Sequence, residues 1–358
     1  MLRVLVRRSR DVSYLTEDPA RELEGVREGP AQWWWRPPSD PRRLDDARGT
    51  LRTSERAAVV GYDLIVAAPR PISILVALDE RNASAVVAAH RRAVDDALSY
   101  LEERAVVVRE RRDGDDRDLP GRWSSVVGFT HGVNRHGEPH LHDHVLVGAL
   151  PEGARGVLDS RALFAHVATA DALYRASLRA GVAGATPYSP WRSFEGVEHV
   201  EGLDEGYRVL WGGHFADRGE KRHWTRADAR ATWTRDLDRF ESHGAVPAPR
   251  RAHGVLAEHT FAASFEGLAH VTRRHLVRAW SDAATWGSGA ADVTASVDRF
   301  YPGLTGARGV REESISVRDA RMVAATRERG PRPLREREVD EWRQRSRVIS
   351  REGLGRSR

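Results

Sequence analysis

Cysteine is absent from the 358-residue sequence. Disulfide bonds, thiolate nucleophiles and cysteine-ligated zinc sites are therefore excluded, and any bound metal must be held by histidines or carboxylates. No run approaches the roughly 18 to 20 consecutive apolar residues that cross a bilayer. The N-terminal MLRVLVRRSRD is short and interrupted by arginines, unlike a secretory signal. We therefore expect a cytoplasmic protein.

Lysine is nearly absent as well, because Lys221 is the only one in the chain. The basic side chains are thus almost all arginines, whose planar fork suits bidentate contact with phosphate. The formal net charge is only +5 and the pI about 9.9, since 52 acids offset 57 basic residues. Such a balance favours a nucleic-acid partner without establishing one, because a basic pI is a weak signal.

The hydrophobic pattern alternates between strand-like and helix-like segments, and the length alone predicts two domains. Alternating, β-branched residues predict strands, whereas apolar residues at helical spacing predict helices. In the first third of the chain, we expect a strand over 2–6, a helix beginning near 9, a strand, turn and helix within 59–78, and a helix over 82–105 with Asn82 as N-cap. Next we expect a strand and a charged turn within 106–123 and two strands over 123–133 and 140–150. Three helices follow, over 167–182, 224–244 and 270–284, the last with a Thr N-cap.

Three adjacent tryptophans, Trp33, Trp34 and Trp35, are followed by Arg36 in the proline-rich stretch GPAQWWWRPPSDPRR. A regular helix or strand would send the three rings in different directions. We expect an irregular loop that its aromatic side chains anchor to the core. The alternative interpretation is a platform on which unpaired bases stack.

The stretch FTHGVNRHGEPHLHDHVLVGAL, residues 129–150, contains five of the chain's 15 histidines. In a strand, side chains at i, i+2 and i+4 share one face, so His140, His142 and His144 point one way and Asp143 points the other. If NRHGEP is a turn, the preceding strand places His131 opposite His142 or His144. Three imidazoles then leave open positions on one metal ion.

The spacing alone does not decide which three histidines bind. His136 lies in the turn, where we expect it to be exposed, and His140 follows Pro139 at the strand's first position. Histidines paired with solvent or with carboxylates such as Asp143 are the alternative. The H-x-H-x-H pattern beside an apolar run favours a metal site but does not specify a reaction.

The segment NRHGEPHLHDHVLV resembles the metal-binding motif of conjugative DNA relaxases of the TrwC/TraI (MobF) type, in the HUH endonuclease superfamily. The resemblance implies that His131, His142 and His144 are the ligands of one divalent ion of the Mn²⁺, Mg²⁺ or Zn²⁺ class. It places Arg135 in the turn and leaves His140 as a variable position.

A second segment, GYDLIVAAPRPISIL, is similar to the relaxase segment that carries an acid near the nucleophile and the metal ligands. The match assigns this acid to Asp63. Arg70 and Pro71 stand where the family has lysine and serine, and we expect Arg70 to contact DNA together with Arg36 and Arg135.

The family's nucleophile is a tyrosine near the N-terminus, often one of several. The match here is Tyr14, in SRDVSYLTED, and the next tyrosine is Tyr62. This departure leaves chemistry with a single tyrosine. The bland interpretation of Tyr14 is a half-buried helix residue.

The resemblance implies an α+β fold, with a central antiparallel sheet flanked by helices and a helical C-terminal extension. It implies a relaxase domain over 1–245. The proline- and arginine-rich stretch AVPAPRRAHG, residues 245–254, indicates a linker, for which we take 246–257. A helical extension over 258–326 and a basic, solvated or disordered tail over 327–358 complete the division.

The activity implied is site- and strand-specific nicking and religation at a conjugative transfer origin of a mobile genetic element, through a 5′-phosphotyrosyl intermediate on single-stranded DNA. We expect a separate helicase and relaxosome or coupling proteins as partners, and translocation with the DNA is compatible with this role. The alternatives are a catalytically inactive relaxase-like protein that binds single-stranded DNA, and a metal-dependent hydrolase using the same histidines.

Overall fold

The structure, a computed structural model, describes residues 1–12, 15, 32–37, 47–53, 58–112, 115–211, 224, 226–240, 256–304 and 312–327. Its centre is a five-stranded antiparallel sheet in the order β1-β3-β7-β6-β2. The strands are β1 (Leu2–Arg7), β2 (Gln32–Arg36), β3 (Gly61–Ala67), β6 (Val126–Val133) and β7 (Pro139–Gly148). The expected α+β fold is confirmed.

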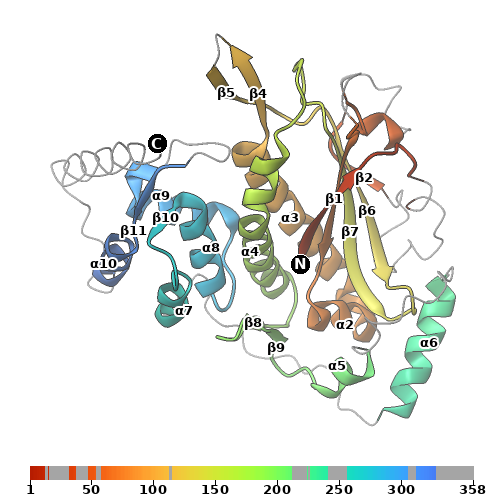
Figure 1. The fold of residues 1–358 in the computed structure, drawn as a ribbon. Coiled ribbons are helices and arrows are strands. Elements are labelled where there is room, and N and C mark those ends of the chain that lie inside the picture. The colour runs from red at the N-terminus through yellow and green to blue at the C-terminus, as the bar shows by residue number, and fades with distance from the viewer. Residues whose placement is uncertain are drawn as a thin grey trace.

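Two 26-residue helices, α3 (Glu80–Ala105) and α4 (Ser160–Ala185), cover one face of this sheet (Figure 1). Every second residue of β3, namely Tyr62, Leu64 and Val66, is buried in the same core cluster as the apolar residues of both helices. The two-residue period of the strand and the helical spacing of the apolar residues therefore meet in one core. The shorter α2 (Arg70–Leu78) leads from β3 into α3.

The opposite face of the sheet carries a second, smaller apolar cluster. Val127, Phe129 and Leu146 contribute from the strands, and Val12, Leu15 and Leu51 cover them. Leu51 follows the short 3₁₀ helix η3 (Ala47–Thr50). This face also carries the histidines discussed below.

Two small hairpins and two helices surround the sheet. The hairpins are β4 (Val107–Arg112) with β5 (Asp115–Pro120), and β8 (Pro190–Arg192) with β9 (Glu198–Val200). The helices are α5 (Gly206–Leu210) and α6 (Arg226–Arg239). Figure 1 shows α6 beside the turn of the β6–β7 hairpin.

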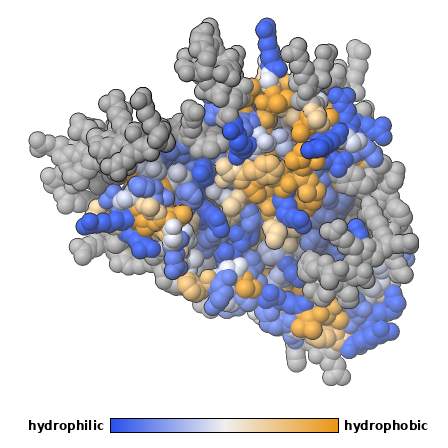
Figure 2. All heavy atoms as spheres, viewed as in Figure 1, coloured by the Kyte–Doolittle hydropathy of each residue, from blue (hydrophilic) through white to orange (hydrophobic). Residues whose placement is uncertain are grey.

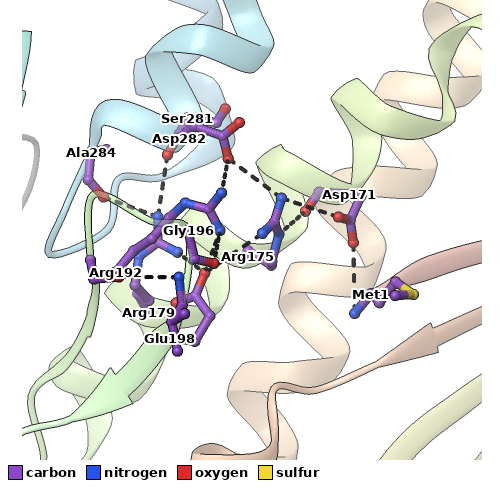
Figure 3. Close-up of polar contacts among 12 residues, drawn as sticks. Met1, Asp171, Arg175, Arg179, Arg192, Gly196, Glu198, Ser281, Asp282 and Ala284 are labelled. Atoms are coloured by element: carbon purple, nitrogen blue, oxygen red, sulfur yellow. Dashed lines mark hydrogen bonds and ion pairs between the residues drawn. The ribbon is translucent and has the colours of Figure 1, made fainter. Parts of the chain in front are cut away.

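The C-terminal part contains α7 (Glu258–Ala263), β10 (His270–Thr272), α8 (Arg273–Ala283), α9 (Ala290–Phe300), η4 (Pro302–Leu304), β11 (Ser314–Ser316) and α10 (Val317–Arg327). Buried apolar residues of α8 and α9 belong to the same core cluster as α4. Arg179 of α4, which is 1% exposed, donates to the carbonyl oxygens of Ser281 and Ala284 at 3.2 and 3.0 Å and pairs with Glu198 at 2.7 Å (Figure 3).

A wider set of charges surrounds Arg179. Arg175 pairs with Asp171 and Asp282, and Arg192 pairs with Glu198 and Asp282. Because these groups come from α4, the β8–β9 hairpin and α8, they join the C-terminal helices to the rest of the protein (Figure 3). The domain boundaries stay a prediction, since most of the expected linker and nearly all of the tail lie outside the described residues.

Several local expectations are corrected. The stretch with the three tryptophans forms strand β2 at the sheet edge rather than an irregular loop, because its backbone pairs with β6. The N-cap of α3 is Asp79, whose carboxylate accepts from the backbone N–H groups of Arg81 and Asn82, so the assignment of Asn82 was wrong. The charged stretch that follows the strand expected from 106 is not only a turn, because its residues Asp115–Pro120 form a second strand, β5, that pairs with β4. Of the helix expected from residue 9, only Leu15 is described as helical.

Apolar surface gathers around β1 and α4 on the face drawn in Figure 2, and the surrounding surface is mostly hydrophilic. Leu5 and Val6 of β1 are 41% and 44% exposed, and Phe164 of α4 is 47% exposed. Within the described residues, no helix combines the length and the apolar character that crossing a membrane requires.

Candidate metal centre

The hairpin formed by β6 and β7 brings three histidines together. His131 of β6 lies directly opposite His142 of β7, and His144 lies opposite Phe129. His142 and His144 share the face away from α3 and α4, whereas Leu141 and Val145 are buried in the core on the helix side. The expected alternation and the expected pairing of His131 are both confirmed.

The three imidazoles have the geometry of a metal site. Their ring centroids are 5.1, 5.3 and 5.5 Å apart, and one nitrogen from each lies within 4.8 Å of the others. His131 is 8% exposed, and the other two are half-buried. Three neutral nitrogen donors around one point suit a divalent ion of the first transition row and leave positions for oxygen ligands.

The other ring nitrogen of two of these histidines is held by a hydrogen bond. Nδ1 of His142 donates to the backbone oxygen of His140 at 2.8 Å, and Nδ1 of His144 donates to both oxygens of Asp63 at 3.0 Å. Protonated Nδ1 atoms leave Nε2 with the lone pair, so each ring presents Nε2 as the ligand atom. The residues present therefore fit a bound metal ion.

Burial keeps the His142 ring in its ligand form. Loss of water, and secondarily the neighbouring His144, lower the pKa of His142 to about 4. Burial also lowers the pKa of His140, whose ring lies 4.7 Å from that of His142. His142 is thus neutral near pH 7, and a metal ion would bind there without displacing a proton.

Asp63 and Asp143 have opposite positions although both are fully buried. Asp63 of β3 lies on the sheet face that carries His131, His142 and His144, which we call the metal face. Asp143 points toward the helices, where His90 Nε2 is 3.6 Å from its Oδ1 and His90 Nδ1 is 2.8 Å from the hydroxyl of Tyr174. Asp143 therefore belongs to a buried polar array behind the sheet and is not a metal ligand.

The turn between the two strands is held by side chains that sequence reasoning did not single out. Trp233 of α6 donates its indole N–H to the backbone oxygen of Gly137 at 2.7 Å, and Trp224 donates to that of Arg135 at 3.1 Å. The only available signal was helical spacing around Trp233, which indicates burial but not its partner. His136 is half-buried in this turn, so the expectation that it is exposed was wrong.

Arg70 reaches the same turn from α2. Its guanidinium donates to the backbone oxygen of Pro139 at 2.7 Å and lies 3.5 Å from a carboxylate oxygen of Glu138. Only 14% of its side chain is exposed, so Arg70 supports the first residue of β7. Arg135 is exposed at the turn. DNA contact by either arginine stays a prediction.

The three tryptophans are half-buried along β2. Trp33 lies so close to Gly128 that a Cβ added to Gly128 would be 2.2 Å from the Trp33 indole. Trp35 contacts Trp123 edge-to-face, with 6.4 Å between the ring centroids. Trp34 packs against the cluster on the metal face. Arg36 pairs with Glu102 at 2.6 Å and lies over the ring of Trp35. Base stacking by these residues stays a prediction.

Tyr14 lies outside the described residues. Its neighbours Val12 and Leu15 are 4% and 0% exposed and pack against Phe129 and Leu146. Val12 and Leu15 therefore lie on the sheet face that carries the three histidines.

Residues 15–212, more than half of the chain, match the model of the TrwC relaxase family. The chain belongs to this family. No curated protein matches the sequence. Solved structures show the same fold: a copper-bound structure of the conjugative relaxase TrwC in complex with oriT DNA has a TM-score of 0.53 at 19% identity. A metal-bound TrwC–oriT complex has a TM-score of 0.52 at 17% identity. TrwC with a 27-mer containing the recognition hairpin and the cleavage site has 0.50 at 18%.

Each of these alignments covers 67% of this chain and 98% of the TrwC relaxase chain. The alignment therefore takes in almost the whole length of the solved TrwC chain, and about a third of this chain lies outside the alignment. The fold, the family and the histidine triad agree with the resemblance that the hairpin motif indicated.

Proposed function

We propose that this TrwC relaxase-family protein nicks and religates one DNA strand at a conjugative transfer origin. The observation that carries the proposal is the histidine triad, with Asp63 hydrogen-bonded to His144. The solved relatives were determined with oriT DNA, and the family is one of DNA-nicking enzymes. The family match and the solved oriT complexes do not favour the binding-only and small-molecule alternatives.

In the proposed reaction, the Tyr14 hydroxyl oxygen attacks the scissile phosphorus and the bond to the 3′ oxygen breaks. The phenol proton leaves to a base or water, and the departing 3′ oxygen gains a proton. The products are a 5′-phosphotyrosyl bond and a free 3′-hydroxyl. Because one phosphodiester replaces another, the reverse attack by a 3′-hydroxyl religates the strand. An unperturbed phenol has a pKa near 10, so its deprotonation must be assisted.

Each residue of the site has a defined part in this proposal. His131, His142 and His144 would hold one divalent ion, which supplies a Lewis acid that offsets charge on the scissile phosphate. Asp63 holds the His144 ring in the orientation and tautomer that ligation requires. Asp63 would also accept or steer the Tyr14 proton, either directly or by orienting His144.

The identity of the ion follows only in part from the donor set. Three imidazoles favour manganese, zinc, nickel or cobalt, and they suit magnesium less well.

Single-stranded DNA would be held by Trp33, Trp34, Trp35, Arg36, Arg70 and Arg135 in addition to the site. A separate helicase and relaxosome or coupling proteins would act with this cytoplasmic enzyme, which would enter the recipient with the transferred strand.

The test is a denaturing gel of the full chain incubated with labelled single-stranded origin DNA and Mn²⁺ or Mg²⁺. We expect a covalent protein–DNA band with the wild type that both Tyr14→Phe and His142→Ala abolish. His199→Ala is the matched control, because His199 is also half-buried but lies on β9 and outside the triad. It should leave the band unchanged.

The other outcomes are equally informative. Tight binding to origin DNA with no covalent band on any strand would replace the proposal with an inactive single-stranded DNA-binding protein. Phosphodiester hydrolysis that survives Tyr14→Phe but not His142→Ala would replace it with a metal-dependent hydrolase.

A further inference from the structure

The register of the sheet extends the metal site across two more strands. His144 pairs with Phe129 on one side and with Ile65 of β3 on the other, and Ile65 pairs with Arg3 of β1. Residues directly opposite one another in a sheet point to the same face. Arg3 therefore lies in the same cross-strand row as His144, two strand spacings or roughly 10 Å away at the backbone.

Burial decreases along this row from β6 toward the edge of the sheet. Phe129 is 1% exposed, His144 and Ile65 are half-buried, and Arg3 is exposed. The adjacent row shows the same trend, with His131 buried and His142 half-buried. Among the described residues, the surroundings of the triad are thus more exposed toward β3 and β1 than toward β6, and we take this as the direction of an extended ligand.

Among the described residues, several arginines around the sheet already have protein partners, and Arg3 differs from them. Arg70 is held by Pro139 and Glu138, and Arg36 is held by Glu102. Arg91 donates to Thr130 on the opposite, helix-covered face. Arg3 makes no hydrogen bond or ion pair with another described residue, and its exposed guanidinium is therefore available to a ligand.

From this arrangement we propose that Arg3 binds a backbone phosphate of the single-stranded DNA next to the one held at the triad. The proposal rests on the proposed function, because it deepens the same site. An arginine fork binds phosphate oxygens bidentately, and an exposed position lets the strand reach it without displacing a protein partner. The DNA would cross the half-buried Ile65 and pass the exposed side chain of Leu5, which gives sugars and bases an apolar floor.

The proposed contact gives Arg3 a positioning role. A phosphate fixed at β1 and a second fixed at the triad would define the direction of the strand between them. The scissile bond would then be placed by two points rather than one. A purely structural arginine would not have this effect, and the Arg3 side chain has no hydrogen bond or ion pair with another described residue to lose.

The experiment measures binding of the full chain to fluorescently labelled single-stranded origin DNA between about 50 and 200 mM salt, with Mn²⁺ present. We expect Arg3→Gln to weaken binding about tenfold, the value of one charge-assisted hydrogen-bonded contact. The slope of log affinity against log salt should fall by about 0.7, which corresponds to one phosphate on a single strand. Arg3→Lys should keep the slope and lose less affinity, because the charge remains but the bidentate fork does not.

Arg81→Gln is the matched control, because Arg81 is exposed at the start of α3, away from the sheet face with the histidines. It removes the same charge and should change neither affinity nor slope. An Arg3→Gln protein with wild-type affinity and slope would overturn the proposal, and so would an equal effect of Arg81→Gln.

The two proposals fail in different ways. A wild type that binds DNA but forms no covalent band refutes nicking, while the salt dependence of Arg3→Gln still decides the phosphate contact. A wild type that does not bind single-stranded DNA at all refutes both.

Discussion

Nδ1 of His144 lies 3.0 Å from each of the two carboxylate oxygens of Asp63. The contact joins β7 to β3 on the metal face, although the two residues are 81 positions apart in the sequence. A buried carboxylate that accepts from a ligand imidazole fixes the ring's tautomer and orientation, and it makes the opposite nitrogen more basic. The three histidines therefore come from β6 and β7, and β3 supplies the carboxylate that supports one of them.

Replacing Asp63 with asparagine should weaken metal binding by about 10- to 100-fold. Asparagine keeps the size of the side chain and one acceptor oxygen but removes the negative charge that supports His144. Isothermal titration with Mn²⁺ or Zn²⁺ measures the change. The control is Asp238→Asn on the exposed side of α6, which should leave the affinity unaltered. Equal affinity of the Asp63→Asn and wild-type proteins would show that the contact does not support the site.

Trp233→Phe should reduce both stability and metal affinity. It preserves an aromatic ring but removes the N–H that donates to Gly137 at the turn of the metal hairpin. The expected loss of unfolding free energy is about 1 kcal/mol, and the affinity should fall severalfold because the turn positions His131 relative to His142. Chemical denaturation and metal titration measure the two effects.

The control for Trp233 separates stability from metal binding. Tyr301→Phe also removes one buried donor, the hydroxyl that bonds to the Ala320 carbonyl at 2.9 Å, but in the C-terminal helices. It should lose comparable stability with no change in metal affinity. If both variants bind metal as the wild type does, α6 has no influence on the triad.

Gly137→Ala should be strongly destabilising, whereas Gly153→Ala should be mild. Both glycines have positive φ, +80° and +67°, so an added Cβ costs about 1 kcal/mol or more of strain in either case. Only at Gly137 would the Cβ also lie 2.6 to 2.7 Å from the ring of Trp224, while nothing lies within 4 Å at Gly153. Chemical denaturation measures the loss of unfolding free energy in each variant, and the difference between the two losses is the contribution of the clash with Trp224. Equal losses would mean that the Trp224 side chain moves away without destabilising the protein.

Asp95→Asn should stabilise the protein at neutral pH. Burial first, and then the nearby Asp143 and Asp96, raise the pKa of Asp95 to about 6 from its ordinary value of 3.8. The folded state therefore takes up a proton that the unfolded state does not hold, so stability falls as the pH rises through this window and stays low above it. Asparagine resembles the protonated form and avoids that loss.

The expected gain for Asp95→Asn is about 1 to 2 kcal/mol at pH 7.5, less than the full conversion of the shift, because part of the carboxyl contacts water. The gain should shrink as the pH is lowered below 6. Denaturation curves at pH 7.5 and pH 5.0 measure it. A gain that is independent of pH would assign the effect to something other than proton uptake by Asp95.

The site was predictable from the sequence to the extent that it is local. The two-residue period of a strand places His140, His142 and His144 on one face, and the short turn brings His131 opposite them, so backbone geometry predicts the cluster, while the choice of His131, His142 and His144 came from the resemblance. Likewise, the periodicity indicated the strand and helix within 59–78 and the long helix that ends at Ala105. The N-cap was missed because Asp79 and Asn82 are both good cap residues, and only the helix's first turn decides between them.

Other features depend on contacts between segments that are distant in the sequence. The tryptophan stretch became a strand because β6 offered backbone partners and Gly128 left room for Trp33, and neither fact is visible in the stretch itself. The hydrogen bonds from Trp224 and Trp233 to the turn, and the position of Arg3 in the row of His144, also required the assembled sheet.

The sequence by itself thus determined that His142 and His144 share a face and that a metal site is expected there, because residues i and i+2 of one strand share a face wherever the strand lies, while the resemblance to the relaxase motif supplied the choice of the three histidines. Only the tertiary structure decided what surrounds those ligands. It set which acid bonds to His144, which residues hold the turn and which described side of the triad is more exposed, because such contacts depend on the pairing order of strands that are separated along the chain by tens of residues.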